Sequence, residues 1–255
     1  MKRAFVFARR NLKELLRDPL SYIFCLGFPI VMLLIMTAIN SMIPEGTQDI
    51  FNIDKLAPGI AVFALSFIML FAALSISKDR AGAFLTRLFA TPMRAYEFTV
   101  GYILPLVIIA LGQFAITYIC AVIIGSIMVV TLSIEGIILS CISLLPAAVF
   151  FISAGLFFGT LLSDKSAPPC SSILISLCGI MGGIWFDLNN VPDDNVFAII
   201  CRILPFSHAT DAARAAISGD LSGIWIHIAI CSAWAIALLI AAVLTFKWRM
   251  MSDKK

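Results

Sequence analysis

Residues 77–101 read SKDRAGAFLTRLFATPMRAYEFTVG and separate two strongly apolar runs of the chain, 57–76 and 98–120. This polar interval carries four basic residues, Lys78, Arg80, Arg87 and Arg94. Its apolar residues recur at helical spacing, at Phe84, Leu85, Leu88 and Phe89. Pro92 cannot continue such a helix. The stretch therefore predicts a short amphipathic helix over 80–91, placed between two membrane-length apolar segments.

The composition indicates that the solvent of this chain is a lipid bilayer. Hydrophobic residues make up 61% of the 255 residues and charged residues 13%, whereas a soluble domain carries roughly 25% charged residues. A spanning helix needs about 20 apolar residues, and irregular chain cannot cross lipid. Six runs meet that length, at 21–40, 57–76, 98–120, 137–162, 168–187 and 224–246. The sequence thus predicts an all-α integral membrane protein with six transmembrane helices in one domain over 1–255, its six-helix core at 21–246.

The distribution of charge predicts the orientation of the chain. With the N-terminus inside, the inner segments are 1–20, 77–97, 163–167 and 247–255. Of the 18 lysines and arginines, only Lys55, Arg202 and Arg214 then lie in the outer segments, whereas most of the acidic residues lie there. By the positive-inside rule, both termini are expected in the cytoplasm, with 247–255 as a cytoplasmic tail.

Residues 1–20 predict an amphipathic cytoplasmic helix that lies in the inner membrane interface. One stripe is apolar and consists of Phe5, Ala8, Leu12, Leu15 and Leu16. The rest of the helix carries bases expected near anionic lipid headgroups, namely Arg9, Arg10, Lys13 and Arg17. The alternative is that these bases act only as an orientation signal.

Two local features concern how the spans bend and pack. Pro29 in the first run removes a backbone hydrogen bond and is expected to bend that helix. Gly155 and Gly159 in the fourth run are four residues apart, a spacing that lets two helices approach closely. Such spacing also arises by chance in an apolar sequence.

The outer segment 188–223 is too interrupted to span the membrane and too apolar for a solvated loop. We expect a short helix or a re-entrant hairpin, because non-spanning backbone at membrane depth must be covered by protein or face a cavity. Asp211 and Arg214 are three residues apart and close enough to pair on a helix. The segment is either an outer gate or a structural cap over the helix ends.

Several motifs are missing from the sequence, and their absence argues against an enzyme. The chain has no phosphate-binding loop, no H-E-x-x-H zinc motif and no G-x-S-x-G nucleophile elbow. Its two histidines, His208 and His227, are expected to be structural. No charged residue lies in the middle third of a span, where proton and ion relays are usually built. We expect no catalytic residue, no cofactor, no metal and no nucleic-acid partner for this chain.

Four segments in order resemble those of type-2 ABC exporter permeases, the membrane-spanning subunits of ATP-binding cassette transporters. The first, Leu16-Arg17-Asp18-Pro19, resembles the end of that family's connecting helix. The second resembles its coupling loop, with Asp79, Gly82, Leu85, Leu88, Pro92, Glu97 and Gly101 in the family's places. The third runs from Gly183 to Pro192, with Asp187 where the family has a proline, and the fourth contains Leu204, Pro205, Asp211, Arg214 and Gly219.

The resemblance implies a permease driven by a separate ATP-binding cassette ATPase subunit, which would hold ATP and Mg. It implies a homodimer or heterodimer with a second permease in the inner (cell) membrane of a prokaryote. The residues expected to dock the ATPase are Asp79, Arg80, Gly82, Phe84, Leu85, Arg87, Leu88, Phe89 and Pro92. Those expected in the outer gate or re-entrant segment are Gly183, Pro192, Pro205, Asp211 and Arg214.

The expected function is export of a hydrophobic or amphiphilic compound, drug-like or lipid, from the cytoplasm or inner leaflet. Candidate path-lining residues are Phe24, Phe28, Phe63, Phe67, Gln113, Trp185 and Phe186. Ordinary helix packing also explains the aromatic residues, and a hydrogen bond between helices explains Gln113. The alternatives are a permease for polysaccharide or lipid-linked glycan export and, in another class, a self-contained secondary carrier or channel.

Overall fold

The computed structural model describes residues 2–43, 49–82, 95–188, 191–192 and 195–252, and none of these residues lies in a strand. The all-α prediction is therefore confirmed. The helices are α1 (Lys2–Leu15), α2 (Pro19–Tyr22), a π-helical turn η1 (Ile23–Gly27), α3 (Phe28–Asn40), a 3-10 turn η2 (Asp49–Phe51), α4 (Ile53–Ala81), α6 (Ala95–Ile127), α7 (Ile134–Ser143), α8 (Leu145–Leu161), α9 (Ala167–Met181), α10 (Val196–Ile203), α11 (Pro205–Ser218) and α12 (Ile224–Ser252).

Five helical stretches of the described chain are long and apolar enough to cross a membrane. They are Pro19–Asn40, Ile53–Ala81, Tyr96–Ile127, Ile134–Leu161 and Ile224–Arg249. The predicted fifth span, 168–187, corresponds to the shorter apolar helix α9 of 15 residues. That helix stops at Met181 because Gly182 and Gly183 follow, and Gly183 adopts a left-handed φ of 61°.

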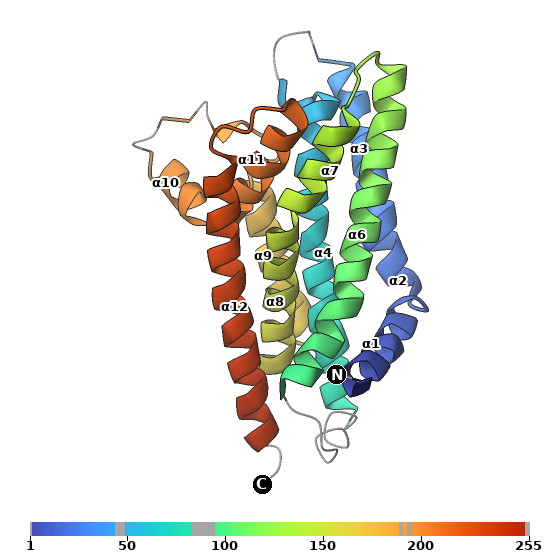
Figure 1. Cartoon of the computed structure of the whole chain (residues 1–255), viewed down its shortest axis with the longest axis vertical. Helices are drawn as coiled ribbons and strands as arrows, with labels where there is room; N and C mark the ends of the chain where they lie inside the picture. Colours follow the sequence, from blue (N-terminus) through green and yellow to red (C-terminus); the bar gives the residue numbers. More distant parts are fainter. Residues whose placement is uncertain (1, 44–48, 83–94, 189–190, 193–194, 253–255) are drawn as a thin grey trace.

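The outer segment forms two helices, α10 and α11, which meet at an angle of 76°. They lie at one end of the bundle, and the N-terminal helix and the C-terminal end of α12 lie at the other (Figure 1). The prediction of short helices that turn back between the last two spans is consistent with this arrangement. Asn195 caps α10 by accepting a hydrogen bond from the backbone N–H of Phe197 at 2.9 Å, and Pro205 starts α11.

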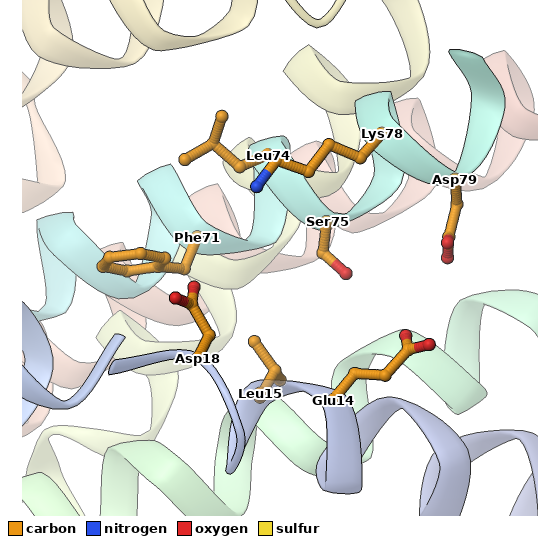
Figure 2. Close-up of a pocket in the computed structure, with 8 residues that line it drawn as sticks. All are labelled: Glu14, Leu15, Asp18, Phe71, Leu74, Ser75, Lys78 and Asp79. Carbon is orange, nitrogen blue, oxygen red and sulfur yellow. The ribbon is translucent and has the colours of Figure 1, made fainter. Parts of the chain in front are cut away.

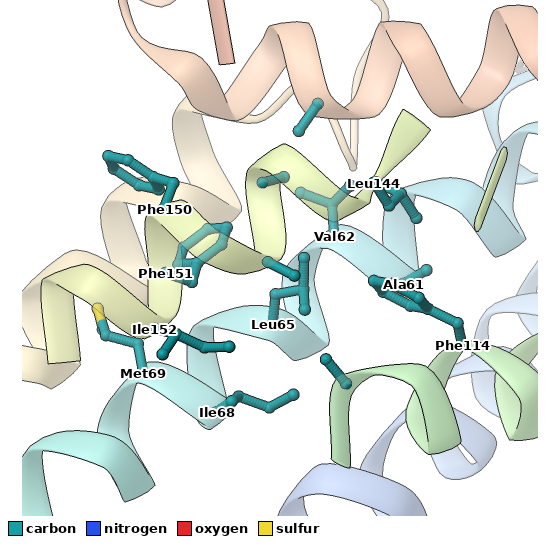
Figure 3. Close-up of a cluster of buried hydrophobic side chains, with 14 of the residues drawn as sticks. Ala61, Val62, Leu65, Ile68, Met69, Phe114, Leu144, Phe150, Phe151 and Ile152 are labelled. Atoms are coloured by element: carbon teal, nitrogen blue, oxygen red, sulfur yellow. The ribbon is translucent and has the colours of Figure 1, made fainter. Parts of the chain in front are cut away.

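Helix α4 is the centre of the bundle. It packs against α3, α6, α8, α9 and α11. In its most apolar stretch of 18 residues, 72% of the residues are buried, whereas the corresponding share for α12 is 17%. Its inward side chains meet those of α6 and α8 in one apolar cluster (Figure 3). Leu65, Ile68, Phe114, Phe151 and Ile152 are almost completely enclosed there.

The contact between α4 and α8 depends on the two glycines of the fourth span. A Cβ atom on Gly155 would lie 2.4 Å from the Met69 carbonyl oxygen, and one on Gly159 would lie 2.7 Å from the Ala73 carbonyl oxygen. Both distances are shorter than van der Waals contact, so only glycine permits this approach. The predicted close packing at these positions is confirmed, and the partner is helix α4 of the same chain.

The first span is irregular in the turn that precedes its proline. Asp18 caps α2 by accepting hydrogen bonds from the backbone N–H of Leu20 at 3.2 Å and the hydroxyl of Ser21 at 3.0 Å. Pro29 has no N–H to offer the Cys25 carbonyl, and the preceding turn, η1, is π-helical. The helix continues beyond Pro29 as α3.

Helix α1 is amphipathic, and the face that it buries on the bundle shares only Ala8 and Leu15 with the predicted apolar stripe. The buried face consists of Ala4, Phe7, Ala8, Asn11 and Leu15, and it lies against α6. Phe5 is 62% exposed and Leu16 is 47% exposed. Phe7 packs directly against Gly101 of α6, and Phe5 and Leu16 point away from the bundle.

Candidate functional site

An ion pair joins α1 to the end of α4, where the polar stretch 77–101 begins. Arg10 binds the carboxylate of Asp79 with both terminal guanidinium nitrogens, each at 3.2 Å from a different oxygen. The hydroxyl of Tyr102 on α6 donates to the same carboxylate at 2.7 Å. Asp79 is only 12% exposed. Its carboxylate therefore ties together α1, α4 and α6, the helices that surround the start and finish of the polar stretch.

A second contact fixes α1 on α6 one residue further along the chain. The side-chain amide of Asn11 donates to the Gly101 carbonyl at 3.1 Å, and Asn11 is buried. A Cβ atom on Gly101 would lie 2.3 Å from Cδ1 of Phe7, whose ring packs edge-on against Tyr102. Gly101 is thus needed for close approach. A rotation or shift of α1 must consequently be transmitted to the start of α6.

Beside the ion pair lies a cavity of about 190 Å³ between α1 and α4. Figure 2 shows Glu14 and Asp18 below it and Lys78 and Asp79 on α4 above it. Glu14 contacts Arg10 at 2.7 Å. Burial by itself lowers the pKa of Arg10, but the hydrogen bond and charge of Asp79, with the charge of Glu14, raise it overall. The Arg10 guanidinium therefore remains charged.

Arginines also join α4, α8 and α12 at the end of the bundle where α1 lies (Figure 1). The guanidinium of Arg80 donates to the carbonyl oxygens of Thr160 and Leu162, and that of Arg249 donates to Leu161 at 3.4 Å. These are the last carbonyls of α8, which have no partner within their own helix. Arg80 was expected to help dock the ATPase, and its guanidinium binds these carbonyls in the structure, so its part in docking stays a prediction.

Most of the predicted docking helix lies outside the described residues. Asp79 and Arg80 belong to the last turn of α4, and Gly82 is its C-terminal cap. The remaining predicted docking residues fall within 83–94, and they are Phe84, Leu85, Arg87, Leu88, Phe89 and Pro92. The described chain stops after Gly82, the cap of α4, and resumes at Ala95, the first residue of α6.

The four bases predicted to face lipid headgroups do not behave alike. Arg9 and Lys13 are exposed on α1 and Arg17 is exposed in the turn that follows it, as that prediction requires. Arg10 is different, because its side chain is 32% exposed and binds Asp79 and Glu14. Its role as a headgroup contact is therefore corrected to a link between helices.

Five of the predicted path-lining aromatic residues form a continuous ladder. Its members alternate between the first span and α4 and finish beyond α9. Successive ring centroids are 5.7 Å apart for Phe24 and Phe67, 4.7 Å for Phe67 and Phe28, 5.7 Å for Phe28 and Phe63, and 5.7 Å for Phe63 and Trp185. Each ring is partly exposed, and Phe24 is 38% exposed. The ladder therefore lies on the open side of a helix that is otherwise enclosed.

Two other predicted path-lining residues are placed elsewhere. Gln113 is completely buried, and its amide donates to the Ala61 carbonyl at 3.1 Å. It links α6 to α4, as the alternative interpretation proposed, and cannot line a path in this conformation. Phe186 packs on Phe197 of α10, with ring centroids 5.8 Å apart.

Arg214 organises the opposite end of the bundle. Its guanidinium donates to the carbonyl oxygens of Lys55 at 3.0 Å, Gly183 at 2.9 Å and Ile184 at 3.5 Å. Arg214 and Asp211 are both described, and no ion pair within 4.0 Å joins them, so the predicted pairing was wrong. The arginine binds instead one carbonyl of α4, at Lys55, and two carbonyls of the segment after α9, at Gly183 and Ile184.

The predicted outer residues are therefore brought together only in part. Gly183 touches Arg214 through its carbonyl, and Pro205 is the first residue of α11. Asp211 lies on α11, and Pro192 is exposed between the two helical regions. These contacts connect α4, the segment after α9 and α11, which agrees with either a gate or a cap.

Two polar pairs were not predicted from the sequence. Arg10 and Asp79 are 69 residues apart, and His208 and His227, whose Nδ1 atoms are 2.7 Å apart, lie on different helices. The sequence contained two relevant features, which were a basic residue, Arg10, beside the apolar positions of the N-terminal helix and two histidines within residues 204–227. Neither signal specifies a partner, since pairing depends on how the helices pack.

The comparison with known proteins agrees with this architecture. The family model described as "ABC-2 type transporter" matches residues 3–218. This range includes α1, the polar stretch 77–101, the aromatic ladder and the outer helices. A search of curated proteins finds no match to the chain. The match over most of its length shows that the chain belongs to the ABC-2 type transporter family and is a membrane permease of that family.

Proposed function

We propose that this permease exports a hydrophobic or amphiphilic compound, drug-like or lipid, and that a separate ATPase subunit drives it through residues 80–91. The observation that carries the proposal is the triple contact of Asp79 with Arg10 and Tyr102. It connects both helices that flank this stretch to α1. A force applied to the stretch reaches α1, α4 and α6 together.

The aromatic ladder supports the choice of substrate class. Phe63, Phe67 and Phe71 are spaced by four residues and lie on one face of α4. This side of α4 is partly open, while the rest of the helix is enclosed by its neighbours. Aromatic rings without adjacent charge favour an apolar molecule or an acyl chain. A second permease subunit facing this surface would complete a path between the two chains.

The coupling follows from the helix contacts. Closure of two ATPase subunits on ATP would displace residues 80–91 of each permease, with the termini in the cytoplasm. The glycine contact between α4 and α8 is rigid, so the displacement moves these helices as one body. α4 carries two rings of the ladder, Phe63 and Phe67. Movement of α4 would therefore change the opening of the path toward the outer end.

Reconstitution tests the proposal directly. The tagged chain is purified with the ATPase that accompanies it and placed in vesicles of bacterial phospholipid. Movement of a lipophilic fluorescent compound is then followed with ATP, without ATP, and with the chain alone. We expect transport only with the ATPase and ATP. Flux through the chain alone, driven by a gradient, would instead identify a self-contained carrier or channel.

The aromatic ladder offers a matched pair of variants for the same assay. Phe67→Ala removes the ring shared by Phe24, Phe28 and Phe63, and we expect transport to fall while ATP hydrolysis continues. Phe157→Ala removes a partly buried aromatic residue of α8 outside the ladder and serves as the control. Equal transport by both variants would remove the ladder from the path.

A further inference from the structure

Three side chains of α12 form a single row of contacts with the corner between α10 and α11. They are His227, Cys231 and Trp234, whose spacing of four and three residues places them on one face of the helix. Their partners are, in that order, Nδ1 of His208 at 2.7 Å and the carbonyl oxygens of Pro205 at 3.4 Å and Ile203 at 3.0 Å. The row fastens the first turns of α12 to the outer corner.

The protons on the histidine pair follow from its hydrogen bonds. Nε2 of His208 lies 2.8 Å from the Arg202 carbonyl oxygen, and a carbonyl can only accept, so Nε2 carries the proton. A neutral imidazole has one N–H, which makes Nδ1 of His208 an acceptor. Nδ1 of His227 must therefore donate to it. This assignment leaves Nε2 of His227 as the nitrogen without a proton.

The pair consequently responds differently to a first and a second proton. A first proton binds Nε2 of His227 and leaves the bond between the two Nδ1 atoms in place, now with a charged donor. A second proton must occupy Nδ1 of His208. Two N–H groups would then face each other at 2.7 Å on two cationic rings, and the contact between α11 and α12 would be lost.

One carboxylate acts on the pair, and two further charged groups act on that carboxylate. The carboxylate of Asp211 on α11 acts on both histidine rings. Arg214 on α11 and Asp187 after α9 act in turn on Asp211. His227 is partly exposed and His208 is buried, so protons reach the pair through His227. Among the described residues, no three His, Cys, Asp or Glu side chains are arranged to hold a metal ion.

We propose that His208 and His227 form a proton-binding site that fastens α12 to the outer corner of the protein. With no proton or one proton added, the row of contacts holds. With two, the first turns of α12 separate from α10 and α11. Acidification on the outer side thus loosens the cap formed by these helices, independently of which compound the permease carries.

Trp234 reports directly on this contact, because its indole N–H is the last hydrogen bond of the row. The full chain is labelled with fluorotryptophan, placed in lipid nanodiscs and studied by fluorine NMR from about pH 8 to about pH 4.5, around the ordinary histidine pKa of about 6.5. The Trp234 resonance is assigned by its loss in Trp234→Phe. Trp248, at the opposite end of α12, is the internal control.

We expect the wild-type Trp234 resonance to shift or split on acidification while that of Trp248 stays in place. In His227→Asn, the side-chain amide can donate to neutral His208 through its NH2 group or, turned over, accept from protonated His208 through its oxygen, so the contact holds in both states and we expect the acid transition to disappear. A wild-type Trp234 resonance that is constant over this pH range overturns the proposal. A transition that persists unchanged in His227→Asn also overturns it and assigns the proton to another group such as Asp211.

Discussion

Replacing Gly155 by alanine tests the contact between α4 and α8, the most enclosed helix pair of the bundle. The added methyl group would lie 2.4 Å from the Met69 carbonyl oxygen and 2.5 Å from Cβ of Ala72. Ordinary contact begins near 3.4 Å. The two helices must therefore separate by about 1 Å at this level, because backbone atoms on α4 cannot turn aside as a flexible side chain would.

The expected cost follows from two opposing effects. Overpacking a well-packed core costs about 1 to 3 kcal/mol. Alanine recovers up to about 1 kcal/mol because its helix propensity exceeds that of glycine. We expect a net loss of about 1 to 2 kcal/mol in the free energy of unfolding for Gly155→Ala. Gly159→Ala should lose less, since its closest contacts are 2.7 Å and 2.9 Å.

Gly112→Ala is the matched control. Gly112 lies inside α6, and a Cβ atom there meets no described atom within 4 Å. This variant has the same gain in helix propensity without the contact, so we expect it to be neutral or stabilised by up to about 1 kcal/mol. The purified variants are unfolded by dodecyl sulfate in mixed micelles, with helix content as the readout.

The order of stabilities decides the outcome. The packing argument requires Gly112→Ala to be at least as stable as wild type, followed by Gly159→Ala and then Gly155→Ala. Equal midpoints for Gly155→Ala and Gly112→Ala would mean that α4 and α8 are not in close contact, and the arrangement of the bundle centre would be wrong.

Two further predictions concern polar contacts. Asp79→Asn keeps the shape of the side chain but removes the charge that Arg10 binds, and should lower the free energy of unfolding by about 1 to 2 kcal/mol. In a double-mutant cycle with Arg10→Met, the two losses should be coupled, and additive losses would contradict the link. Arg214→Lys cannot reach the carbonyls of Lys55, Gly183 and Ile184 together and should lose about 1 to 3 kcal/mol in the same unfolding assay; an unchanged midpoint would show that these bonds contribute nothing.

The sequence predicted the helices of this fold but not which of them is central. The most apolar stretches of α4 and α12 have the same mean hydropathy, yet 72% of the residues in the α4 stretch are buried and only 17% of those in the α12 stretch. Lipid and protein interior are both apolar, so composition does not separate a lipid-facing helix from an enclosed one. The glycine pair Gly155 and Gly159 was the one packing signal in the sequence that identified a close contact.

The polar contacts were predicted less completely for a related reason. Arg10 was interpreted as a lipid contact because its position on a basic helix gave no sign of Asp79, 69 residues away. Asp211 and Arg214 were paired by helical spacing, but the guanidinium binds three backbone carbonyls on other segments of the chain. Local spacing reveals which residues share a face, whereas the partner on another helix depends on the packed structure.

The central claim is that a partner ATPase drives this permease through residues 80–91, and a double substitution tests it most directly. Leu85→Asp with Leu88→Asp places charge in the apolar stripe predicted to dock the ATPase, and Thr86→Asp places charge on the other side of that helix by its spacing. We expect the double variant to lose both the co-purifying ATPase and ATP-driven transport in vesicles, while its unfolding midpoint and the behaviour of Thr86→Asp stay as in wild type. A double variant that retains the ATPase and transports at the wild-type rate would contradict the claim.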